Sequence, residues 1–345
     1  MVSKKKILLV GYMGYHEYTT TLPIVNQLEL IGCEVVRIGG DTDWFVEENK
    51  QHMIANWVLD SDSINLKDFD IVFFIDWWNR TVPLMHYKKS IENPNVKFVA
   101  LCHGTVNFDS DVAHMFTDHK EYEHYLTKCY DKVLVPYDWL TKIILPYQDL
   151  IDKSWDKFVT TLWPTDLLQE RDRPEIEPTN RIIYSHRFGS DKGDLDFINF
   201  VMYCRRSNDD YIRNISFIIT DDLNDEDMRM CSQLGITVTG RLSQDKLKEL
   251  CKKGGYAWGM PSSETFGYAV LDLVSYGLHP LLDHHPAYSH FPEKFKFDTM
   301  QQATRLIKDT FPDFRELKMS NKEWYDMIRP MKLNAFNMAL EIVRT

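Results

Sequence analysis

The sequence predicts an α/β protein built from two parallel sheets, each with helices on both faces. Three observations support this prediction. Short buried strands alternate with helical segments along the chain, its 345 residues suit two domains of ordinary size, and a segment rich in proline and charge, 166–178, separates two such series. We therefore expect ligands to bind outside the carboxyl ends of the strands.

The first series precedes the proline-rich segment. Residues 6–12 form a buried strand that ends in a glycine turn. A helix from about Thr19 to Ile31 follows it, with apolar positions at Leu22, Val25 and Leu28. The remaining apolar runs predict strands at 34–38, 70–75, 97–101 and 132–136.

The second series follows the proline-rich segment. Its apolar runs predict strands at 181–184, 215–219, 236–239, 256–260 and 279–283. Helices are expected at 195–204, at 247–251 and directly after Gly267, and residues 321–344 have the apolar spacing of a further helix. The two series predict an N-terminal domain over 1–166 and a C-terminal domain over 167–320.

Composition limits the kind of protein. Hydrophobic residues make up 44% and charged residues 26%, which is typical of a soluble globular chain. No apolar run approaches the roughly 20 residues that span a bilayer, and the N-terminus lacks a signal-peptide pattern. The six cysteines are scattered without a C-x-x-C pair, so we expect reduced thiols, a cytoplasmic location and neither disulfides nor a zinc site.

The net charge of −11 is unevenly placed. Residues 1–170 contain 16 Lys and Arg against 25 Asp and Glu, which gives a net charge of −9. Non-specific attraction to nucleic acid depends on neutralising phosphates with basic side chains, so this balance weighs against a DNA polymer as partner. No basic amphipathic helix indicates membrane binding.

The most informative segment is Pro261–Gly277, which follows the predicted strand 256–260. A strand, then a turn with Glu264 and Gly267, then a helix is the arrangement that binds a phosphate, because free N–H groups and the dipole at a helix N-terminus favour an anion. Asp272 lies about two turns beyond Glu264. This pairing of N–H donors with carboxylates suits a ligand that carries both a diphosphate and sugar hydroxyls. The alternative is an ordinary buried strand and helix with incidental acids.

The second informative segment is Tyr184–Gly193. A strand ends, a loop presents Arg187 and Lys192, and a helix starts after Gly193. Two cations at the end of a strand can hold a leaving diphosphate and neutralise the charge that grows as a bond to it breaks. The alternative is a surface loop with two solvated cations.

Together these segments resemble the E-x7-E and G-R-x-x-x-x-K-G motifs of retaining glycosyltransferases with the GT-B fold, in particular the GT4 family. The spacing of Arg187 and Lys192 is that of the family. Three positions depart from its pattern: Asp272 replaces the second Glu, and Thr265 and His186 each replace a Gly. The resemblance covers nearly the whole chain.

The resemblance implies two facing Rossmann-like domains with a cleft between them, and a C-terminal helix, 321–345, that packs back on the N-terminal domain. It implies a hexosyl- or pentosyltransferase with a UDP-sugar as donor substrate and no essential cofactor. Catalytic roles would fall to Arg187, Lys192, Glu264 and His103, the last facing the transferred sugar. Donor binding would involve Gly14, Arg241, Thr265, Phe266, Gly267 and Asp272. For His103 the alternative is a histidine bonded to backbone at the core edge, and for Arg241 a side chain that caps a strand.

The acceptor site is less defined. Its candidate residues are Tyr15, His16 and Glu17, which would border the acceptor, and Trp77, Trp78 and Arg80. The aromatic pair could stack on a sugar ring or an extruded base, or else pack under a loop. The composition, rich in Lys, Asp, Asn, Tyr and Phe, resembles that of virulent bacteriophage proteins, several of which glycosylate hydroxymethylated DNA bases. Such a base, modified in the host cytoplasm, is the lead acceptor; a surface glycan or a small molecule is the alternative.

Three D-x-D pairs occur, namely Asp41/Asp43, Asp60/Asp62 and Asp109/Asp111. Such a pair can hold a divalent metal against a diphosphate, but three matches are expected by chance in so acidic a chain. We expect no essential metal, with Arg187 and Lys192 in its electrostatic role. Two other classes stay open: a GT-B-shaped nucleotide-sugar epimerase, which needs no acceptor, and a nucleotide-sugar-binding protein without catalysis. Nothing in the sequence indicates the oligomeric state.

Overall fold

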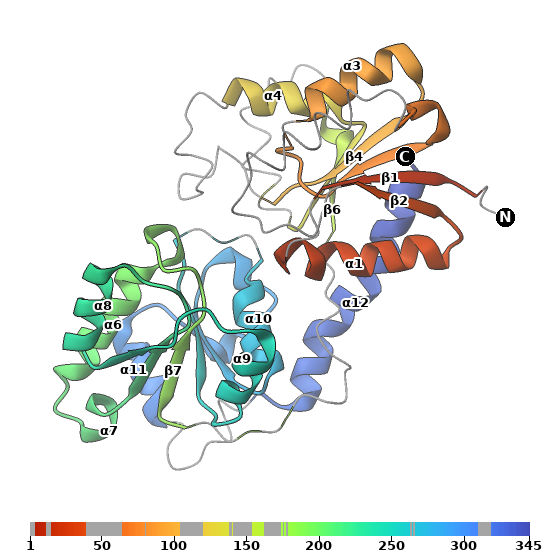
Figure 1. Cartoon of the computed structure of the whole chain (residues 1–345). Coiled ribbons are helices and arrows are strands. Elements are labelled where there is room, and N and C mark those ends of the chain that lie inside the picture. Colours follow the sequence, from red (N-terminus) through yellow and green to blue (C-terminus); the bar gives the residue numbers. More distant parts are fainter. Residues whose placement is uncertain are drawn as a thin grey trace. The chain divides into compact units, whose positions relative to one another are not determined.

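The computed structural model describes residues 4–11, 15–38, 64–79, 81–103, 120–137, 140, 154–161, 174, 176, 179–262, 264, 266–309 and 319–345, without the side chains of 15–20, 120, 154–155, 309 and 332. Contacts divide the chain into two units (Figure 1). Unit 1 consists of Met1–Asp166 with Ile328–Thr345, and unit 2 of Leu167–Met327. Each unit contains a six-stranded parallel sheet, so the predicted α/β class with two sheets is confirmed.

Unit 1 has the strand order β2-β1-β3-β4-β5-β6. The strands are β1 (Lys6–Val10), β2 (Glu34–Ile38), β3 (Ile71–Phe74), β4 (Lys97–Leu101), β5 (Lys132–Val135) and β6 (Phe158–Thr160). The five predicted strands of the first series are confirmed, although β1, β3 and β5 are slightly shorter than predicted. The edge strand β6 is absent from the prediction because only one of its three side chains, Phe158, is buried.

The central strand β1 is buried on both faces, and its side chains alternate between two cores. Leu8 and Val10 pack with α3 (Val82–Glu92) and α4 (Lys120–Cys129), whereas Ile7 and Leu9 pack with α1 (Tyr15–Leu30) and α12 (Asn321–Val343). Figure 1 shows these two pairs of helices on opposite faces of the sheet. Burial on both faces explains why the strand is a continuous apolar run in the sequence.

The helix predicted over 321–344 is confirmed as α12, which begins in unit 2 and ends in unit 1. Its C-terminal half contributes Met338, Ala339 and Ile342 to the core of unit 1. The ammonium of Lys132, at the start of β5, lies 3.1 Å from the carboxylate of Glu341. Part of the core of unit 1 therefore comes from residues that follow unit 2 in the chain.

Unit 2 has the strand order β12-β11-β10-β7-β8-β9. The strands are β7 (Arg181–Tyr184), β8 (Ser216–Ile219), β9 (Ile236–Val238), β10 (Tyr256–Gly259), β11 (His279–Asp283) and β12 (Lys296–Phe297). The first five are confirmed predictions, and β12 is a two-residue edge strand. Counted from β9, this is the 3-2-1-4-5-6 order of a Rossmann sheet, whose strand order reverses between β7 and β10.

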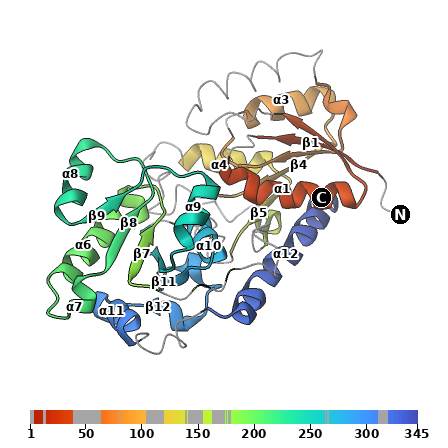
Figure 2. The ribbon, with the colours of Figure 1, turned by 60° about the horizontal axis from the view of Figure 1, so that its bottom comes forward.

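The helices of unit 2 cover both faces of its sheet. Figure 2 shows α6 (Asp194–Arg205), α8 (Asp225–Gln233) and α11 (Met300–Asp309) on one face, and α9 (Gln244–Cys251) and α10 (Tyr268–Ser275) on the other. The short α7 (Asp210–Arg213) packs with α6 and α11. The predicted helices α6, α9 and α10 are confirmed. In the described part of the chain, no helix has the length and apolar character needed to cross a membrane.

The six cysteines are free and buried. Burial raises the pKa of both Cys204 and Cys251 to about 12, so these side chains remain thiols at neutral pH.

Gly193 allows α6 to start directly against the end of β10. Its φ of 73° lies in the left-handed region. A Cβ at this position would lie 1.9 Å from the carbonyl oxygen of Met260, so no other residue fits without a backbone shift. The close approach sets Lys192, the residue before it, beside the loop that follows β10.

Replacement of Gly193 should therefore destabilise unit 2 strongly. Gly193→Ala should lower the free energy of unfolding by more than about 3 kcal/mol, since a left-handed φ alone costs roughly 1–2 kcal/mol and the overlap with Met260 adds to it. Gly235→Ala is the matched control, because Gly235 has φ 66° but its nearest atom to an added Cβ is 3.8 Å away. Urea unfolding followed by circular dichroism compares the two; equal losses would contradict the packing argument.

Candidate active site

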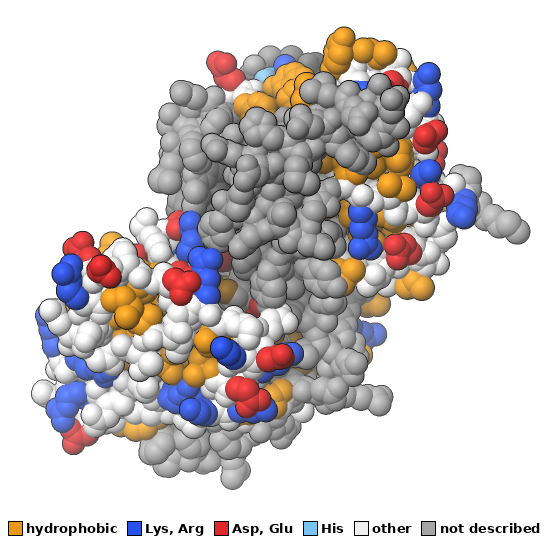
Figure 3. All heavy atoms as spheres, in the orientation of Figure 1, with side chains coloured by type: hydrophobic (Ala, Val, Ile, Leu, Met, Phe, Trp, Pro, Cys, Tyr) orange, Lys and Arg blue, Asp and Glu red, His pale blue; other side chains and the backbone are white. Residues whose placement is uncertain are grey.

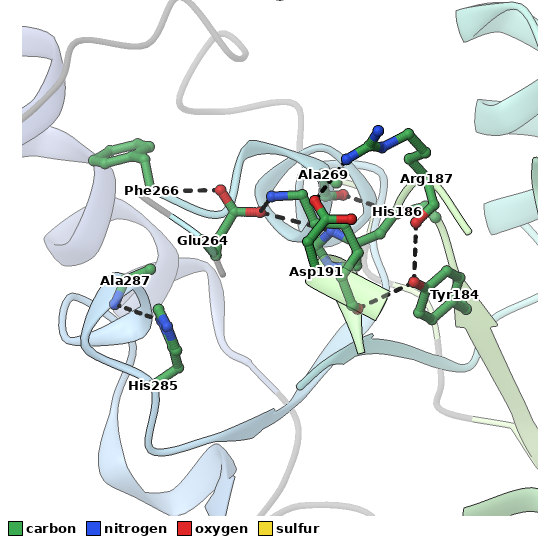
Figure 4. A network of polar contacts seen from close by, with 11 residues as sticks. Tyr184, His186, Arg187, Asp191, Glu264, Phe266, Ala269, His285 and Ala287 are labelled. Carbon is green, nitrogen blue, oxygen red and sulfur yellow. Dashed lines mark hydrogen bonds and ion pairs between the residues drawn. The ribbon is translucent and has the colours of Figure 1, made fainter. Parts of the chain in front are cut away.

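The loop after β7 is held by the side chain at the end of that strand. The Tyr184 hydroxyl lies 3.1 Å from the carbonyl oxygen of Arg187 and 3.0 Å from that of Lys192 (Figure 4). Ser262, from the loop after β10, donates a hydrogen bond of 2.7 Å to the carbonyl oxygen of Ser190. The two loops are thus joined at the carboxyl edge of the sheet, where the strand order reverses.

Lys192 and Glu264 meet at this edge. The Lys192 ammonium lies 3.3 Å from the Glu264 carboxylate, and their side chains are 23% and 14% exposed. Nδ1 of His186 lies 3.8 Å from the same carboxylate oxygen. The backbone N–H of Phe266 donates to the other oxygen at 3.4 Å. Figure 4 shows Glu264 between Phe266 and His186, with the two loops on either side.

The electrostatic environment keeps Glu264 ionised and His186 neutral. Burial by itself raises the pKa of Glu264, but the Lys192 ammonium, followed by His186 and the N–H groups of Gly267 and Phe266, lowers it to about 2. Burial lowers the pKa of His186 to about 4, and burial likewise lowers that of His285 to about 4. At neutral pH the cluster therefore holds one carboxylate and one ammonium beside uncharged imidazoles.

Helix α10 begins at this cluster. Gly267 precedes its first residue with φ 79°, and the Glu264 carboxylate lies beside the N–H groups of Phe266 and Gly267. The Phe266 ring is buried and stacks on His290 with ring centroids 5.2 Å apart, so it is the backbone of Phe266 that faces Glu264. Asp272 lies one turn inside α10 and is 8% exposed. The N-terminus of α10, beside a cation, is suited to bind an anion.

Arg187 is paired with a carboxylate of its own loop. Its guanidinium lies 2.6 Å from the Asp191 carboxylate, and its side chain is 44% exposed. Figure 4 shows the Arg187 side chain turned toward Asp191. The structure therefore brings Lys192 together with Glu264, whereas Arg187 is paired with Asp191.

Arg241 lies in the turn after β9, directly behind Gly240, whose φ is 69°. Its Nε donates to the buried Asp221 carboxylate at 2.9 Å, and its side chain is 52% exposed. Asp221 follows β8, the strand between β7 and β9. Arg241, which the resemblance predicts to bind the base, is thus hydrogen-bonded through Nε, while about half of its side chain is exposed to solvent.

In unit 1, His103 lies just past the end of β4. Its Nε2 lies 2.6 Å from the carbonyl oxygen of Ile75, which follows the neighbouring strand β3. Such a bond to backbone is what the alternative interpretation of His103 predicts. Gly11, after β1, lies against the same residue, since an added Cβ would lie 2.0 Å from a side-chain carbon of Ile75.

Asp76 is a candidate that the sequence analysis does not include. It lies beside His103, and burial raises the pKa of its carboxyl although the His103 charge acts in the opposite direction. Its Oδ1 accepts the N–H of Trp78 at 3.0 Å. The sequence feature that could have identified Asp76 is its position directly after the buried strand β3. The strand order of unit 1 reverses between β1 and β3, and ligands bind at such a position.

The two tryptophans of the acceptor prediction differ. Trp77 is fully buried and packs edge-on against Phe158, so its ring belongs to the core of unit 1, as the packing alternative predicts. Trp78 is partly buried, and its Nε1 donates to Glu123 at 3.1 Å.

Several predicted site features lie outside the described residues. These are Gly14, Arg80, Thr265, the side chains of Tyr15, His16 and Glu17, and all three D-x-D pairs. Among the described residues, no three His, Cys, Asp or Glu side chains form a group that could hold a metal ion.

Comparisons with known proteins identify the fold. No family model matches the chain, and no curated protein matches it in sequence. Solved structures do match over nearly its full length. A glycosyltransferase from Rickettsia africae ESF-5 has a TM-score of 0.68 at 16% identity, and the alignment covers 99% of this chain and 100% of that one. Sucrose-phosphate synthase from Thermosynechococcus elongatus has a TM-score of 0.71 at 11% identity, covering 99% and 98%.

A third match is an alpha-glucosyltransferase solved in complex with UDP and a 13-mer DNA containing an HMU base. Its TM-score is 0.62 at 12% identity, with 99% of this chain and 100% of that one covered. These structural neighbours are GT-B glycosyltransferases, and the predicted GT-B fold is confirmed. At such low identities the likeness establishes the fold.

The depressed pKa of Glu264 makes stability depend on pH. Its ordinary pKa of 4.5 falls to about 2 in the folded chain, so the carboxylate stabilises the fold above pH 4.5, and this contribution is lost as the pH falls toward 2. Glu264→Gln should therefore lower the free energy of unfolding by about 3 kcal/mol at pH 7, and the difference from wild type should narrow between pH 5 and pH 3.

The control for this experiment is Glu249→Gln. Glu249 forms an exposed ion pair with Lys252 on α9, and its loss should change stability by less than roughly 0.5 kcal/mol at either pH. Urea titrations at several pH values measure both variants. A constant difference between wild type and Glu264→Gln across this range would show that the carboxylate has an ordinary pKa.

Proposed function

We propose that this chain is a retaining glycosyltransferase that moves a sugar from a UDP-sugar to an acceptor hydroxyl. The observation that carries the proposal is the Lys192–Glu264 pair, which lies where the strand order of unit 2 reverses and beside the N-terminus of α10. In open α/β sheets this is the position at which ligands bind. The nucleotide-sugar motifs in the sequence and the GT-B fold of the chain support the same assignment.

The two loops supply what the departure of a diphosphate requires. As the bond between the anomeric carbon and the diphosphate oxygen breaks, its electron pair stays on that oxygen, and negative charge grows there. The Lys192 ammonium, the Arg187 guanidinium and the N–H groups at the start of α10 would stabilise that charge. The acceptor hydroxyl would then bond to the anomeric carbon on the same face, and its proton would pass to the leaving phosphate oxygen.

The remaining residues would position the donor. Glu264 and the backbone at Phe266 and Gly267 would orient the sugar, and Asp272 would accept a hydrogen bond from the ribose. Arg241 would stack on the base. His103 would contact the sugar near its 6-position, and Gly14 would approach the diphosphate. Thr265 lies in the sugar-binding segment by resemblance.

Carboxylates hold both cations before the donor arrives. Lys192 is paired with Glu264 and Arg187 with Asp191, so a diphosphate has to compete with both. Arg187 is the more exposed of the two and would turn toward the ligand by changing its side-chain rotamer. Asp76, partly buried beside His103, is a described carboxylate of unit 1 that could form a hydrogen bond with the acceptor hydroxyl.

The lead acceptor is a hydroxymethylated base in bacteriophage DNA, modified in the cytoplasm of the host. Support comes from the composition and from the match with the alpha-glucosyltransferase solved with DNA, which has the same fold over the full length of both chains. The net charge of −9 over residues 1–170 weighs against a broad electrostatic contact with DNA, and Figure 3 shows basic and acidic side chains intermixed on the described part of the surface that it draws.

Loss of either phosphate-binding cation should abolish most of the transfer. Lys192→Ala and Arg187→Ala should each lower kcat by roughly 100-fold or more, since charge stabilisation of this kind is worth several kcal/mol. Lys252→Ala, which removes the exposed lysine directly after α9, should leave kcat unchanged. UDP release from UDP-glucose with acceptor present is the measurement, and wild-type rates in both site variants would remove the proposed roles.

The acceptor can be identified in one screen. Duplex DNA with hydroxymethylated cytosine or uracil, and unmodified duplex as control, is incubated with UDP-glucose, UDP-galactose or UDP-N-acetylglucosamine, and the nucleosides are then weighed by mass spectrometry. A nucleoside heavier by one sugar, absent from the control, is the expected product. UDP release without it would move the acceptor to a glycan or small molecule, and a new UDP-sugar epimer would instead favour the epimerase class.

A further inference from the structure

We propose that Asp221 is a positioning residue, which holds the diphosphate loop and the base-binding turn of the donor site in a fixed arrangement. The inference rests on the proposed function, because it concerns how the same site recognises a nucleoside diphosphate. Asp221 is neither in a motif of the sequence analysis nor among the residues assigned to the reaction above.

The two oxygens of the Asp221 carboxylate serve two different loops. Oδ2 accepts the backbone N–H of Phe188 at 2.8 Å, in the loop between Arg187 and Lys192. Oδ1 accepts Nε–H of Arg241 at 2.9 Å, in the turn after β9. Asp221 itself is only 6% exposed. One buried carboxylate thus joins the segment with the phosphate-binding cations to the segment with the base-binding arginine.

The strand order explains why Asp221 can reach both. It follows β8, which lies between β7 and β9, and the two loops follow those neighbouring strands. Parallel strands end at the same edge of a sheet, so a short carboxylate after the middle strand is close to both flanking loops. The Phe188 ring packs against Tyr184 with centroids 6.0 Å apart, which fixes the same loop from its other side.

Burial makes this connection stronger than a surface contact. A carboxylate removed from water is stable only where it is paired and hydrogen-bonded, and hydrogen bonds to an ionised acceptor are stronger than those between neutral groups. An asparagine at this position can offer only one acceptor oxygen, and its NH₂ group would face one of the two N–H donors. Asp221→Asn should therefore release one loop while leaving the size of the side chain almost unchanged.

The bond to Nε also determines how Arg241 presents its guanidinium. With Nε fixed at Asp221, the plane of the guanidinium is fixed, while about half of the side chain is exposed. A planar cation held in this way can stack on a nucleobase without first losing rotational freedom. Asp222 makes the weaker and more exposed contacts: it accepts the backbone N–H of Arg241 at 3.1 Å, its carboxylate lies 3.8 Å from Nε of Arg241, and its side chain is 70% exposed. Asp222→Asn is therefore the matched control.

Calorimetric titration with UDP and with inorganic pyrophosphate tests the proposal. Asp221→Asn should weaken UDP binding by about tenfold or more and pyrophosphate binding by less, because UDP uses both connected segments and pyrophosphate only one. Asp222→Asn should bind both ligands within about twofold of wild type. In an Arg241→Ala background, Asp221→Asn should weaken UDP binding only as much as it weakens pyrophosphate binding.

A folded Asp221→Asn variant, judged by circular dichroism at the titration temperature, that binds UDP as wild type does would overturn the proposal. Where Asp221→Asn is too unstable to titrate, Arg241→Lys provides the second test: it keeps the charge but loses the Nε donor, and should weaken UDP binding while leaving pyrophosphate binding unchanged. Equal losses for both ligands would overturn the positioning role. Wild-type protein that binds neither UDP nor pyrophosphate would instead refute the proposed function itself.

Discussion

The candidate active site depends on one interaction, the ion pair between Lys192 and Glu264. Both side chains are largely buried, and a buried charge is tolerated only next to a partner, so the loops that carry them must stay together. Two left-handed glycines permit this approach. Gly193 lets α6 begin against the end of β10, and Gly267 directs the chain from Glu264 into α10. The Lys192–Glu264 pair therefore stabilises the local fold in addition to any part that it has in the chemistry of the site.

A common feature of the site is that each cation is already held by a carboxylate: Lys192 by Glu264, Arg187 by Asp191 and Arg241 by Asp221. This arrangement keeps three positive charges near one another without an anionic ligand. It also orders their side chains in advance, which reduces the entropy lost when a ligand binds. The ligand must in turn offer each cation a better partner than its resident carboxylate, and a diphosphate with its several oxygens can do so for two of them.

Strands could be predicted well from the sequence because continuous apolar runs such as residues 7–10 and 256–259 are buried on both faces. Helices α3 and α4 could not, since each turns only a few apolar side chains inward and α3 exposes Leu84, Tyr87 and Ile91. Lys192 and Glu264 could be placed at the carboxyl edge of a sheet because each follows a predicted strand of a parallel sheet. Side-chain geometry cannot be read from the spacing of residues along a chain. For this reason the sequence did not predict the pairing of Arg187 with Asp191, the burial of Trp77 or the two hydrogen bonds of Asp221.

The division of unit 1 between two distant stretches of sequence has a consequence for biosynthesis. Ile7 and Leu9 in β1 share a core with Met338 and Ile342 in α12, and those residues leave the ribosome only after all of unit 2 has been translated. A nascent chain that ends in unit 2 thus carries a sheet whose one face is covered by α1 but not yet by α12. During that interval the nascent chain is exposed to aggregation and to chaperone capture, so the pace of translation through unit 2 bears on the yield of native protein.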